Sequence, residues 1–376
     1  MAGDKKLIKL NKGSLDMPFL IILLIIVAFG LVMLFSASYA NAYYYRNDSF
    51  HYIKRQLIFA VAGLVMMFII SKIDYHILQK FALPLYLVSL VLLVLVLIFP
   101  GGGNAKRWLG IGSFQFQPSE VAKFAVILIC ARWISLNHKV MNTFRFGVLP
   151  FMIILGLVAV LMVLEPHLSG TILILSIGLV LMFVGGTQLR WFGIGLCVIA
   201  AAVTVIILTP NLVSYAQDRV EMWLNPWSDP QVKGYQTIQS LYAIGSGGFM
   251  GLGLGNSRQK YLYIPEAQND FVFSILCEEL GFVGATIVII LFALLVWRGI
   301  SIAMRAKDKF GSILAVGLTM QVGLQAILNI AVVTNTIPNT GISLPFFSYG
   351  GTSLIMLLCQ MGVILSISRS AGEEKQ

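Results

Sequence analysis

Long apolar stretches separated by mostly short polar connections are the dominant pattern along the 376-residue chain. Each stretch holds about 20 residues, the length that an α-helix needs to cross about 30 Å of hydrocarbon at 1.5 Å per residue. Hydrocarbon cannot hydrogen-bond to exposed backbone groups, so the spanning segments are expected to be helices. The pattern predicts an all-α, polytopic membrane protein, a bundle of ten transmembrane helices at residues 17–37, 55–72, 82–99, 118–136, 147–164, 168–186, 189–209, 269–297, 311–334 and 350–369.

The composition agrees with this prediction. Hydrophobic residues make up 58% of the chain and charged residues only 11%, whereas soluble domains carry about 25% charged residues. The first apolar run, residues 17–35, is longer than the roughly 7–15 residues of a signal-peptide core, so we expect it to remain as a span. Residues 1–376 are therefore expected to form a single membrane domain.

The net charge of +10 is distributed unevenly between the two sides of the predicted bundle. Ten spans place both termini on one side, which carries 16 of the 26 Lys and Arg residues, whereas the other side carries nine and Lys123 lies within a span. The excess predicts that the tails, residues 1–16 and 370–376, are cytoplasmic. Topology and anionic membrane lipid explain the basic excess, and no nucleic-acid-binding motif accompanies it.

Two predicted external connections are long: residues 100–117 and residues 210–268, the second a large loop between the seventh and eighth helices. Long segments at a membrane face are usually functional or disordered. Six glycines cluster between Gly245 and Gly255 in the second connection. Glycine lets another backbone or a phosphate approach the chain closely, so the cluster fits either structural packing or phosphate binding.

Ionisable residues within or next to apolar stretches are functional candidates, because a charge at mid-bilayer costs roughly 2.5–3.5 kcal/mol on insertion scales. In this chain they gather at one predicted membrane face, at the external ends of the spans. They are Arg107, Glu120, Lys123, Glu165, His167, Glu266 and Asp270. We expect them to form a polar, partly desolvated chamber near the outer headgroups.

Several of these residues also have purely structural interpretations. Glu120 and Lys123 are one helical turn apart, so they can form an ion pair that only holds helices together. His167 can titrate near neutral pH, or act as a capping or hydrogen-bonding group at a helix start. Glu266 can complement a helix dipole. Asp270 begins a long helix and faces the large loop, so it is a candidate catalytic residue.

A second pair of acids, Glu278 and Glu279, lies about two turns deeper along the eighth span than Asp270. Carboxylates at that depth need polar partners, because an unpaired charge inside a membrane is costly. We expect them to satisfy groups such as Asn329 inside the bundle rather than to contact a substrate.

Four segments, in order along the chain, resemble motifs of the SEDS proteins, the RodA/FtsW/SpoVE family of cell-wall synthases. They are Lys106–Lys123, which contains Lys-Arg-Trp-Leu and Gln-Pro-Ser-Glu, Gly234–Gly255, Tyr263–Gly281, and Leu344–Gly351, which ends in Phe-Ser-Tyr-Gly-Gly. The third and fourth segments are more similar to the division and sporulation members than to the elongation member. One position departs from the family, which often has Pro-Asp-Leu-Gly where this chain has His167 after the proline.

The resemblance implies a peptidoglycan glycosyltransferase in the plasma membrane of a bacterial cell, which polymerises lipid II during cell division or sporulation. It also implies a partner, a class B penicillin-binding protein that acts as the transpeptidase and cross-links the strands. Other division or sporulation membrane proteins and membrane lipid would be further partners, and nucleic acid would not.

The resemblance further implies roles for the charged residues. Asp270 would be the general base that takes the proton from the attacking sugar hydroxyl. Positive side chains would stabilise the departing diphosphate, and the candidates are Arg107, Lys106, Arg258 and Lys260. Glu120 and Lys123 would shape the chamber, and Glu266 would tune Asp270 or help to hold a divalent cation, Mg²⁺ or Mn²⁺.

Two other functions fit the same sequence. A polar chamber in a helix bundle also suits a flippase for a lipid-linked oligosaccharide such as lipid II, although the sequence shows no inverted repeat of the kind found in many secondary transporters. A scaffold that only recruits division proteins would leave the chamber residues without a catalytic role. Polymer synthesis from lipid II distinguishes the enzyme from both alternatives.

Overall fold

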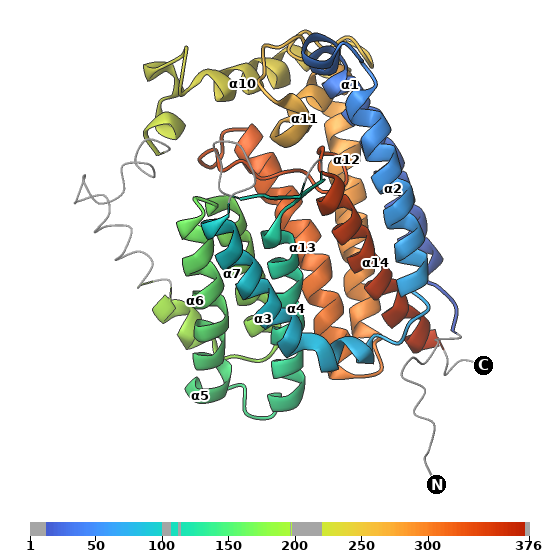
Figure 1. Ribbon diagram of the computed structural model, residues 1–376, viewed down its shortest axis with the longest axis vertical. Coiled ribbons are helices and arrows are strands. Elements are labelled where there is room, and N and C mark those ends of the chain that lie inside the picture. Colours follow the sequence, from blue (N-terminus) through green and yellow to red (C-terminus); the bar gives the residue numbers. More distant parts are fainter. Residues whose placement is uncertain (1–12, 100–106, 112–113, 196, 198–219, 373–376) are drawn as a thin grey trace.

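The structure, a computed structural model, describes residues 13–99, 107–111, 114–195, 197 and 220–372 (Figure 1). Within these residues the chain is a bundle of long helices with a layer of short elements at one end. Seven helical segments are long and apolar enough to cross a membrane: Met17–Arg46 (α1), His51–Ile70 (α2), His76–Ile98 (α3), Phe144–Leu164 (α5, Phe144–Gly147, and α6, Leu149–Leu164), Val272–Met304 (α12), Lys309–Val333 (α13) and Gly351–Ala371 of α14 (Gly351–Gly372). The protein is therefore a multi-pass membrane protein.

These seven segments coincide with seven of the ten predicted spans. Two more predicted spans are helices that do not meet the same criteria. Pro118–Asn137 (α4) carries three charged side chains, and Leu168–Val184 (α7) has only 17 residues. The remaining predicted span, residues 189–209, lies largely outside the described residues. Its described part, residues 189–195, is helical.

Asp16 connects the first helix of the bundle to the last ones. Its carboxylate caps α1 by accepting a hydrogen bond from the Phe19 amide at 3.1 Å, as an N-cap aspartate is expected to do. The same carboxylate forms an ion pair with Arg298 of α12 at 2.8 Å, and the Asp16 amide donates to the Ser368 hydroxyl of α14 at 3.3 Å. The start of α1 and the end of α14 therefore lie on the same side of the bundle.

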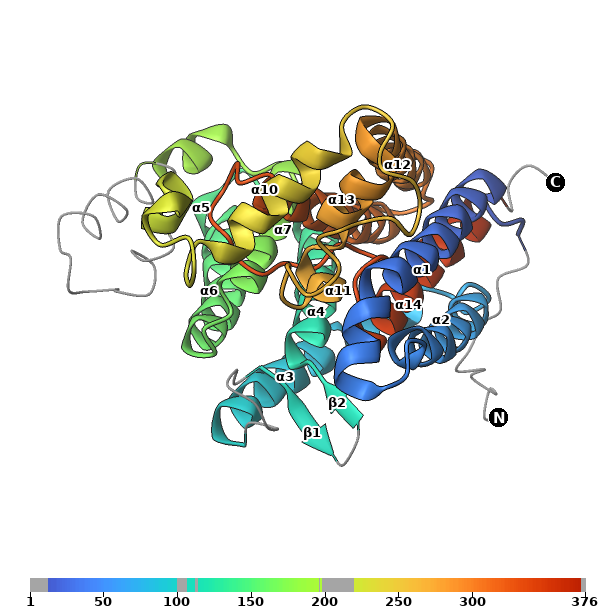
Figure 2. The ribbon, with the colours of Figure 1, turned by 90° about the horizontal axis from the view of Figure 1, so that it is seen from above.

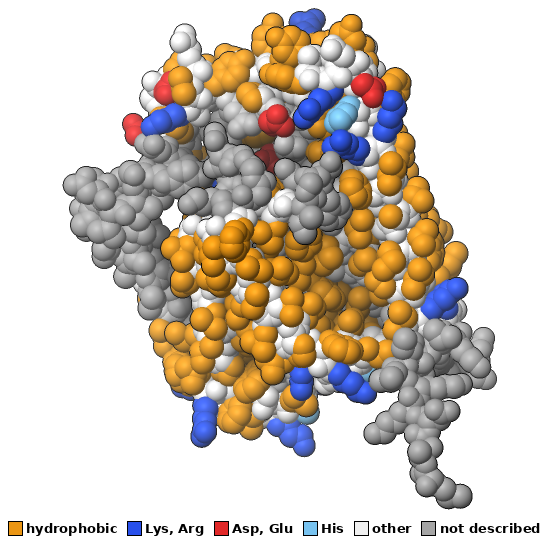
Figure 3. Space-filling view, in the orientation of Figure 1, with side chains coloured by type: hydrophobic (Ala, Val, Ile, Leu, Met, Phe, Trp, Pro, Cys, Tyr) orange, Lys and Arg blue, Asp and Glu red, His pale blue; other side chains and the backbone are white. Residues whose placement is uncertain are grey.

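The helices pack most extensively as neighbouring pairs, α2 with α14, α12 with α13, and α3 with α4. On the face that Figure 3 shows, hydrophobic side chains form a broad band across the middle of the molecule, with Lys and Arg towards both ends and Asp and Glu towards the upper end. Such a band is the surface expected of a protein that faces hydrocarbon. The buried interior combines a large apolar core with many buried polar side chains.

A small hairpin precedes α4, which the all-α prediction missed. Leu109–Ile111 (β1) pairs in antiparallel fashion with Phe114–Phe116 (β2), and Pro118 then starts the helix. Proline is favoured there because the first helical position needs no amide donor. Figure 2 shows the hairpin at the periphery of the bundle, beside α3 and α4.

Two short helices, Tyr235–Gly247 (α10) and Ala267–Asp270 (α11), lie over one end of the bundle (Figures 1 and 2). They follow the 3-10 helix Pro226–Ser228 (η1) and belong to the predicted external loop. The Ser240 hydroxyl of α10 hydrogen-bonds to the Ser274 hydroxyl of α12 and to a carbonyl of α13, both at 2.7 Å. This layer is therefore anchored to the bundle, and we call this end the α11 side.

The longest helix, α12, is broken at Gly281, where φ is +66°. The sequence predicted one continuous span over 269–297, so the break corrects that prediction. The loop after α10 runs beside the break and exchanges backbone hydrogen bonds with it: Leu252 to Glu278 (3.0 Å), Gly253 to Glu279 (2.9 Å), Phe282 to Gly248 (3.0 Å) and Val283 to Phe249 (3.2 Å). A Cβ at Gly251 would collide with the α12 backbone. At this glycine the structural-packing interpretation is confirmed.

Candidate functional site

A cavity of about 920 Å³ lies at the α11 side, between the ends of α1, α2, α4, α7, α13 and α14. Its charged lining comprises four cations and two carboxylates: Arg46, Arg55, Arg107, Lys123, Glu120 and Asp270. Apolar side chains such as Phe59 and Leu357 and polar ones such as Gln325 and Asn269 also line the cavity. The described lining therefore has two positive charges in excess beside apolar surface, which suits an anionic amphiphile.

Asp270 ends α11 and lines the cavity with a half-buried side chain. The amide of Asn329 fixes its backbone by donating to the Asp270 carbonyl at 2.8 Å and to the Ile342 carbonyl at 2.6 Å. The loop that follows α13 passes so close that a Cβ at Gly341 would lie 3.2 Å from the Asp270 carboxylate. The backbone of Asp270 is therefore fixed, and its side chain lines the cavity.

The surroundings of Asp270 make it a stronger base than a free aspartate. Burial raises the pKa of Asp270 to about 6, the positive charge of Arg107 lowers it, and the negative charge of Glu266 raises it further. A carboxylate with this pKa is still ionised at neutral pH and has a higher proton affinity than usual. This is the property that a general base requires.

Arg107 reaches the cavity from the segment that leads into the hairpin. Its guanidinium donates a hydrogen bond to the Pro166 carbonyl at the junction of α6 and α7. Lys106, the other cation predicted here, lies outside the described residues. Arg107 is thus the described member of this pair, and it faces the same cavity as Asp270.

Glu120 and Lys123 form an ion pair in the first turn of α4, with 2.8 Å between the Lys123 nitrogen and a Glu120 oxygen. Both side chains are buried and line the cavity. The second Glu120 oxygen has no hydrogen-bond partner among the described residues. The expected ion pair is confirmed, and its position in the cavity wall leaves one carboxylate oxygen for a ligand.

The sequence interpretation did not include a second group of cavity residues, contributed by α1 and α2. Arg46 ends α1, and His51 and Arg55 belong to the first turns of α2. The helix α1 continues nine residues beyond the predicted span, which ended at residue 37, and so carries Arg46 to the cavity rim. Residues 38–45 are small or aromatic and include no glycine or proline, and this was the feature of the sequence that could have indicated a longer helix.

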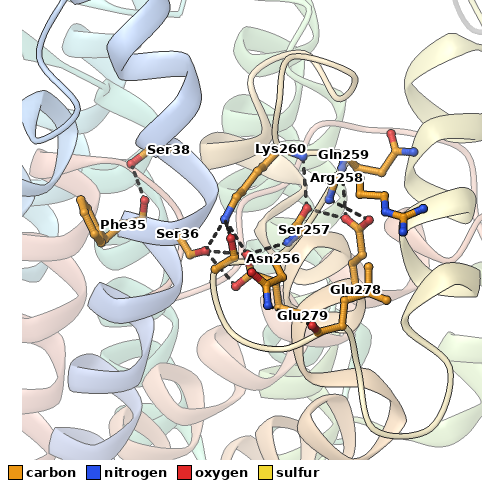
Figure 4. A network of polar contacts seen from close by, with 12 residues as sticks. Phe35, Ser36, Ser38, Asn256, Ser257, Arg258, Gln259, Lys260, Glu278 and Glu279 are labelled. Carbon is orange, nitrogen blue, oxygen red and sulfur yellow. Dashed lines mark hydrogen bonds and ion pairs between the residues drawn. The ribbon is translucent and has the colours of Figure 1, made fainter.

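The structure places Lys260 away from the cavity, in a buried ion pair with Glu279 (Figure 4). The Lys260 nitrogen lies 3.0 Å from the Glu279 carboxylate, with side-chain exposures of 3% and 0%. The Ser36 hydroxyl of α1 donates to both Glu279 oxygens at 2.6 and 2.8 Å. Lys260 therefore fastens the loop to α1 and α12, which differs from the expected contact with a diphosphate.

The neighbouring Glu278 fastens the same loop through backbone groups (Figure 4). It accepts hydrogen bonds from the Ser257 hydroxyl and from the amides of Arg258 and Gln259, at 3.0 and 3.2 Å for the two amides. The expectation that Glu278 and Glu279 satisfy polar partners is confirmed. The predicted contact of these acids with Asn329 is wrong, because the Asn329 side chain donates to the carbonyls of Asp270 and Ile342 instead. We call residues 256–260 with Glu278, Glu279 and Ser36 the carboxylate clasp.

Arg258 and Glu266 also lie outside the cavity lining. Arg258 is exposed on the loop, and Glu266 is exposed at the N-cap of α11 without capping it. The Glu266 carboxylate accepts hydrogen bonds from the side-chain amides of Gln268 and Asn269 at 2.9 and 3.0 Å. Its influence on Asp270 is therefore electrostatic rather than direct.

The predicted divalent cation finds no complete set of protein ligands. Among the described residues, no three His, Cys, Asp or Glu side chains come close enough together to hold a metal ion. Mg²⁺ is often held by only one or two carboxylates together with substrate phosphates. A cation at this site would therefore need ligand atoms from a substrate, and Glu266 is not placed in the cavity to supply one.

His167 corrects two expectations at once. It is the N-cap residue of α7, but its side chain makes no capping hydrogen bond. Burial lowers the pKa of His167 to about 3, helped by the positive charges of Arg107 and Lys123, so it does not titrate near neutral pH. The ring instead lines the cavity.

The helical bundle and its chamber define a multi-pass membrane protein with a cationic cavity at one face. Comparison with known proteins gives the family. The chain belongs to the FtsW/RodA/SpoVE family, whose profile carries the description "Cell cycle protein" and matches residues 16–373.

Several relatives match nearly the whole chain. Stage V sporulation protein E of Bacillus subtilis is 43% identical over 364 residues, 96% of this chain and 98% of the relative. A probable peptidoglycan glycosyltransferase FtsW of Geobacter sp. is 40% identical, with 94% and 96% covered. The closer similarity to division and sporulation proteins that the motifs indicated is consistent with these matches.

Solved structures share the fold. A chain from a structure on the coordination of polymerization and crosslinking by a peptidoglycan synthase complex superposes with a TM-score of 0.80 at 29% identity, covering 95% of this chain and 98% of that chain. The rod shape determining protein RodA of Thermus thermophilus gives a TM-score of 0.70 at 28% identity, with 95% and 97% covered.

Proposed function

We propose that this protein is a peptidoglycan glycosyltransferase that polymerises lipid II into glycan strands during cell division or sporulation, with Asp270 as the general base. The observation that carries the proposal is the placement of Asp270 in one cavity with Arg107 and Lys123, next to apolar wall. Lipid II combines a diphosphate, a sugar and a hydrocarbon chain, and the cavity offers surfaces for each. The relatives named as peptidoglycan glycosyltransferases support the same activity.

The reaction joins an attacking sugar hydroxyl to an anomeric carbon while a lipid diphosphate leaves. Asp270 accepts the proton of the attacking hydroxyl as the new bond forms. Arg107, one of the four cations of the lining, stabilises the charge that develops on the leaving diphosphate. Glu120 and Lys123 shape the wall of the same cavity. Preorganised charges in a partly desolvated cavity act more strongly than they would in water.

The topology proposed with this function has ten spans, the α11 side outside the bacterial plasma membrane, and both termini in the cytoplasm. The joint position of Asp16 and Ser368 supports a common side for the chain ends. Residues 1–376 form one membrane domain in this topology, and residues 210–268 form its large external loop. A class B penicillin-binding protein that cross-links the new strands is the proposed partner, together with other division or sporulation membrane proteins.

The test is polymerisation of purified lipid II by the full chain with its transpeptidase partner. Asp270→Asn keeps the size of the side chain and removes the base, so we expect polymer formation to fall by about 10²-fold or more. Asp48→Asn is the matched control, because Asp48 is a carboxylate on the same side that does not line the cavity. Both variants should keep the unfolding temperature of the wild type.

Two results would decide against the proposal. Full polymerisation by Asp270→Asn would remove Asp270 from the reaction. Movement of labelled lipid II across proteoliposome membranes by the wild type, with no polymer formed, would favour the flippase instead. Normal activity after every substitution in the cavity, with partner binding intact, would favour a scaffold.

A further inference from the structure

The start of α7 is a part of the cavity wall to which the proposed reaction assigns no role. Ser169 and Gly170 of its first turn line the cavity beside the N-cap residue His167. No side chain caps this end, and the first amides of an α-helix have no acceptor further back in the same helix. The helix dipole places partial positive charge at the same end. Together these groups favour an anionic ligand.

The imidazole of His167 points independently to a ligand at this place. The side chain is only 8% exposed, lines the cavity, and its Nδ1 has no hydrogen-bond partner among the described residues. A neutral ring has one N–H to donate. A proton on the enclosed Nδ1 would bury an unpaired N–H, so we assign the proton to Nε2.

The charged groups around His167 make its surroundings cationic. Arg107 holds the carbonyl of Pro166, the residue before His167, and Lys123, which is paired with Glu120, lines the same cavity. Glu165 is 1% exposed, and burial raises its pKa to about 8 against the opposing charge of Arg107. Glu165 is therefore mostly protonated at neutral pH and does not neutralise Arg107. A ligand drawn to this corner is an anion, which a neutral imidazole contacts as a hydrogen-bond donor.

We propose that the first turn of α7, with His167 and Arg107, forms the subsite for the diphosphate of the lipid-linked substrate, and that His167 donates its Nε2–H to a phosphate oxygen. The identity of this ligand rests on the proposed function, whereas the site itself requires an anion with several oxygen acceptors. His167 acts in binding and orientation, and it transfers no proton. Gly170 leaves room for the ring, since a Cβ at Gly170 would lie 2.9 Å from it.

The first experiment measures binding of geranylgeranyl diphosphate to the purified full chain, with inorganic pyrophosphate and geranylgeraniol as headgroup and chain controls. His167→Met removes the donor at similar size, and His167→Gln keeps an N–H in a similar place. A hydrogen bond to a charged group is lost in the first variant, so we expect about tenfold weaker binding of the diphosphate probes. His167→Gln should stay within about threefold of the wild type. Neither variant should change the affinity for geranylgeraniol.

The second experiment observes the imidazole directly. The chain has four histidines, and the His167 resonances in ¹⁵N-labelled protein are those missing from His167→Gln. We expect the neutral tautomer with Nε2–H, unchanged between pH values of about 6 and 8, and a shift on addition of geranylgeranyl diphosphate but not of geranylgeraniol. A resonance that does not move at saturating diphosphate, or wild-type affinity in His167→Met, would overturn the inference.

Measuring diphosphate binding separately from polymer formation distinguishes a failure of this inference from a failure of the proposed function. Asp270→Asn should bind geranylgeranyl diphosphate at least as tightly as the wild type does, because Asp270 is not a phosphate ligand and its loss removes a negative charge from the cavity. Diphosphate binding through His167 without polymer formation would refute the glycosyltransferase and leave the subsite standing. Polymer formation with unaltered binding in His167→Met would refute the subsite alone.

Discussion

The buried ion pair of Lys260 and Glu279 allows a quantitative test of how the carboxylate clasp holds its loop. The perturbations are Lys260→Met, Glu279→Met and the double variant. Lys260→Met leaves the Glu279 carboxylate with only the hydroxyl of Ser36 and the amide of Ser257, at 3.3 Å, as donors. Glu279→Met leaves the Lys260 ammonium with the Ser36 hydroxyl and a loop carbonyl. Each single change therefore leaves a buried charge without its ionic partner.

Removal of one partner of a buried pair costs about 3–5 kcal/mol of unfolding free energy, because the remaining charge is uncompensated. In the double variant no charge is left. The buried groups left unpaired are then the hydroxyl of Ser36 and the amide of Ser257, at about 0.5–1.5 kcal/mol for each lost hydrogen bond. The carbonyl of Gly255 also loses Lys260, but Gly255 is exposed to water. We therefore expect the double variant to lose about 1–3 kcal/mol. That loss is less than either single variant shows and far below their sum.

The measurement is equilibrium unfolding of the purified chain in detergent micelles, with hydrogen exchange of residues 251–260 as the local readout. Lys54→Met is the matched control, since it breaks a surface pair with Asp48 whose lysine is 64% exposed, and it should leave stability unchanged. A double variant that loses the sum of the two single effects would refute the coupling between Lys260 and Glu279. Single variants indistinguishable from Lys54→Met would show that the pair is not buried.

Three further predictions concern the cavity. Gly341→Ala places a methyl group 3.2 Å from the Asp270 carboxylate at a φ of +68°, so we expect at least tenfold slower polymer synthesis, whereas Gly156→Ala, which meets no atom within 4 Å, should be neutral. Because the pKa of Asp270 is raised to about 6, initial rates should rise with pH through about 6. The free energy of unfolding should change in the opposite direction. The contribution of protonated Asp270 is fully present below its ordinary pKa of 3.8 and is lost as pH rises through about 6. Arg107→Lys keeps the charge but loses the planar fork, so kcat/KM for lipid II should fall about tenfold.

The positions of most spans could be predicted because hydrocarbon thickness sets their length. Seven predicted spans coincide with helices that meet the length and hydropathy of a span. The boundaries were less predictable where a helix leaves the apolar zone, as in α1, which continues to Arg46. Apolar length reports where lipid ends, and a helix can extend beyond that point into water or into another layer of the protein.

The chamber could be predicted in part, because residues at the same depth of several spans must lie near one another. Asp270, Arg107, Glu120 and Lys123 share one cavity for this reason. Depth alone does not tell which side chains point inward. The interpretation therefore missed Arg46 and assigned to the site cations that lie elsewhere.

Lys260 shows why the large loop could not be predicted. Its position in the sequence marks it as an external cation, yet the loop folds back and buries it against Glu279. The pairing depends on the break at Gly281, and a glycine in an apolar helix is too common to indicate a break. The adjacent acids Glu278 and Glu279 were the available signal, since two buried carboxylates demand donors, but the sequence offered several candidates for that role.

The break and the clasp together explain how an irregular segment can sit beside a membrane bundle. Gly281 lies nine residues after Val272, about 14 Å along the helix, where backbone groups without partners would be costly. The loop after α10 supplies backbone partners on both sides of the break. Further along the same loop, Glu278 binds the amide of Arg258 and Glu279 binds the ammonium of Lys260. The chain then needs only the ten residues from 261 to 270 to reach the cavity. Asp270, the proposed general base on a short helix, thereby gains a fixed support that the few residues of α11 could not provide.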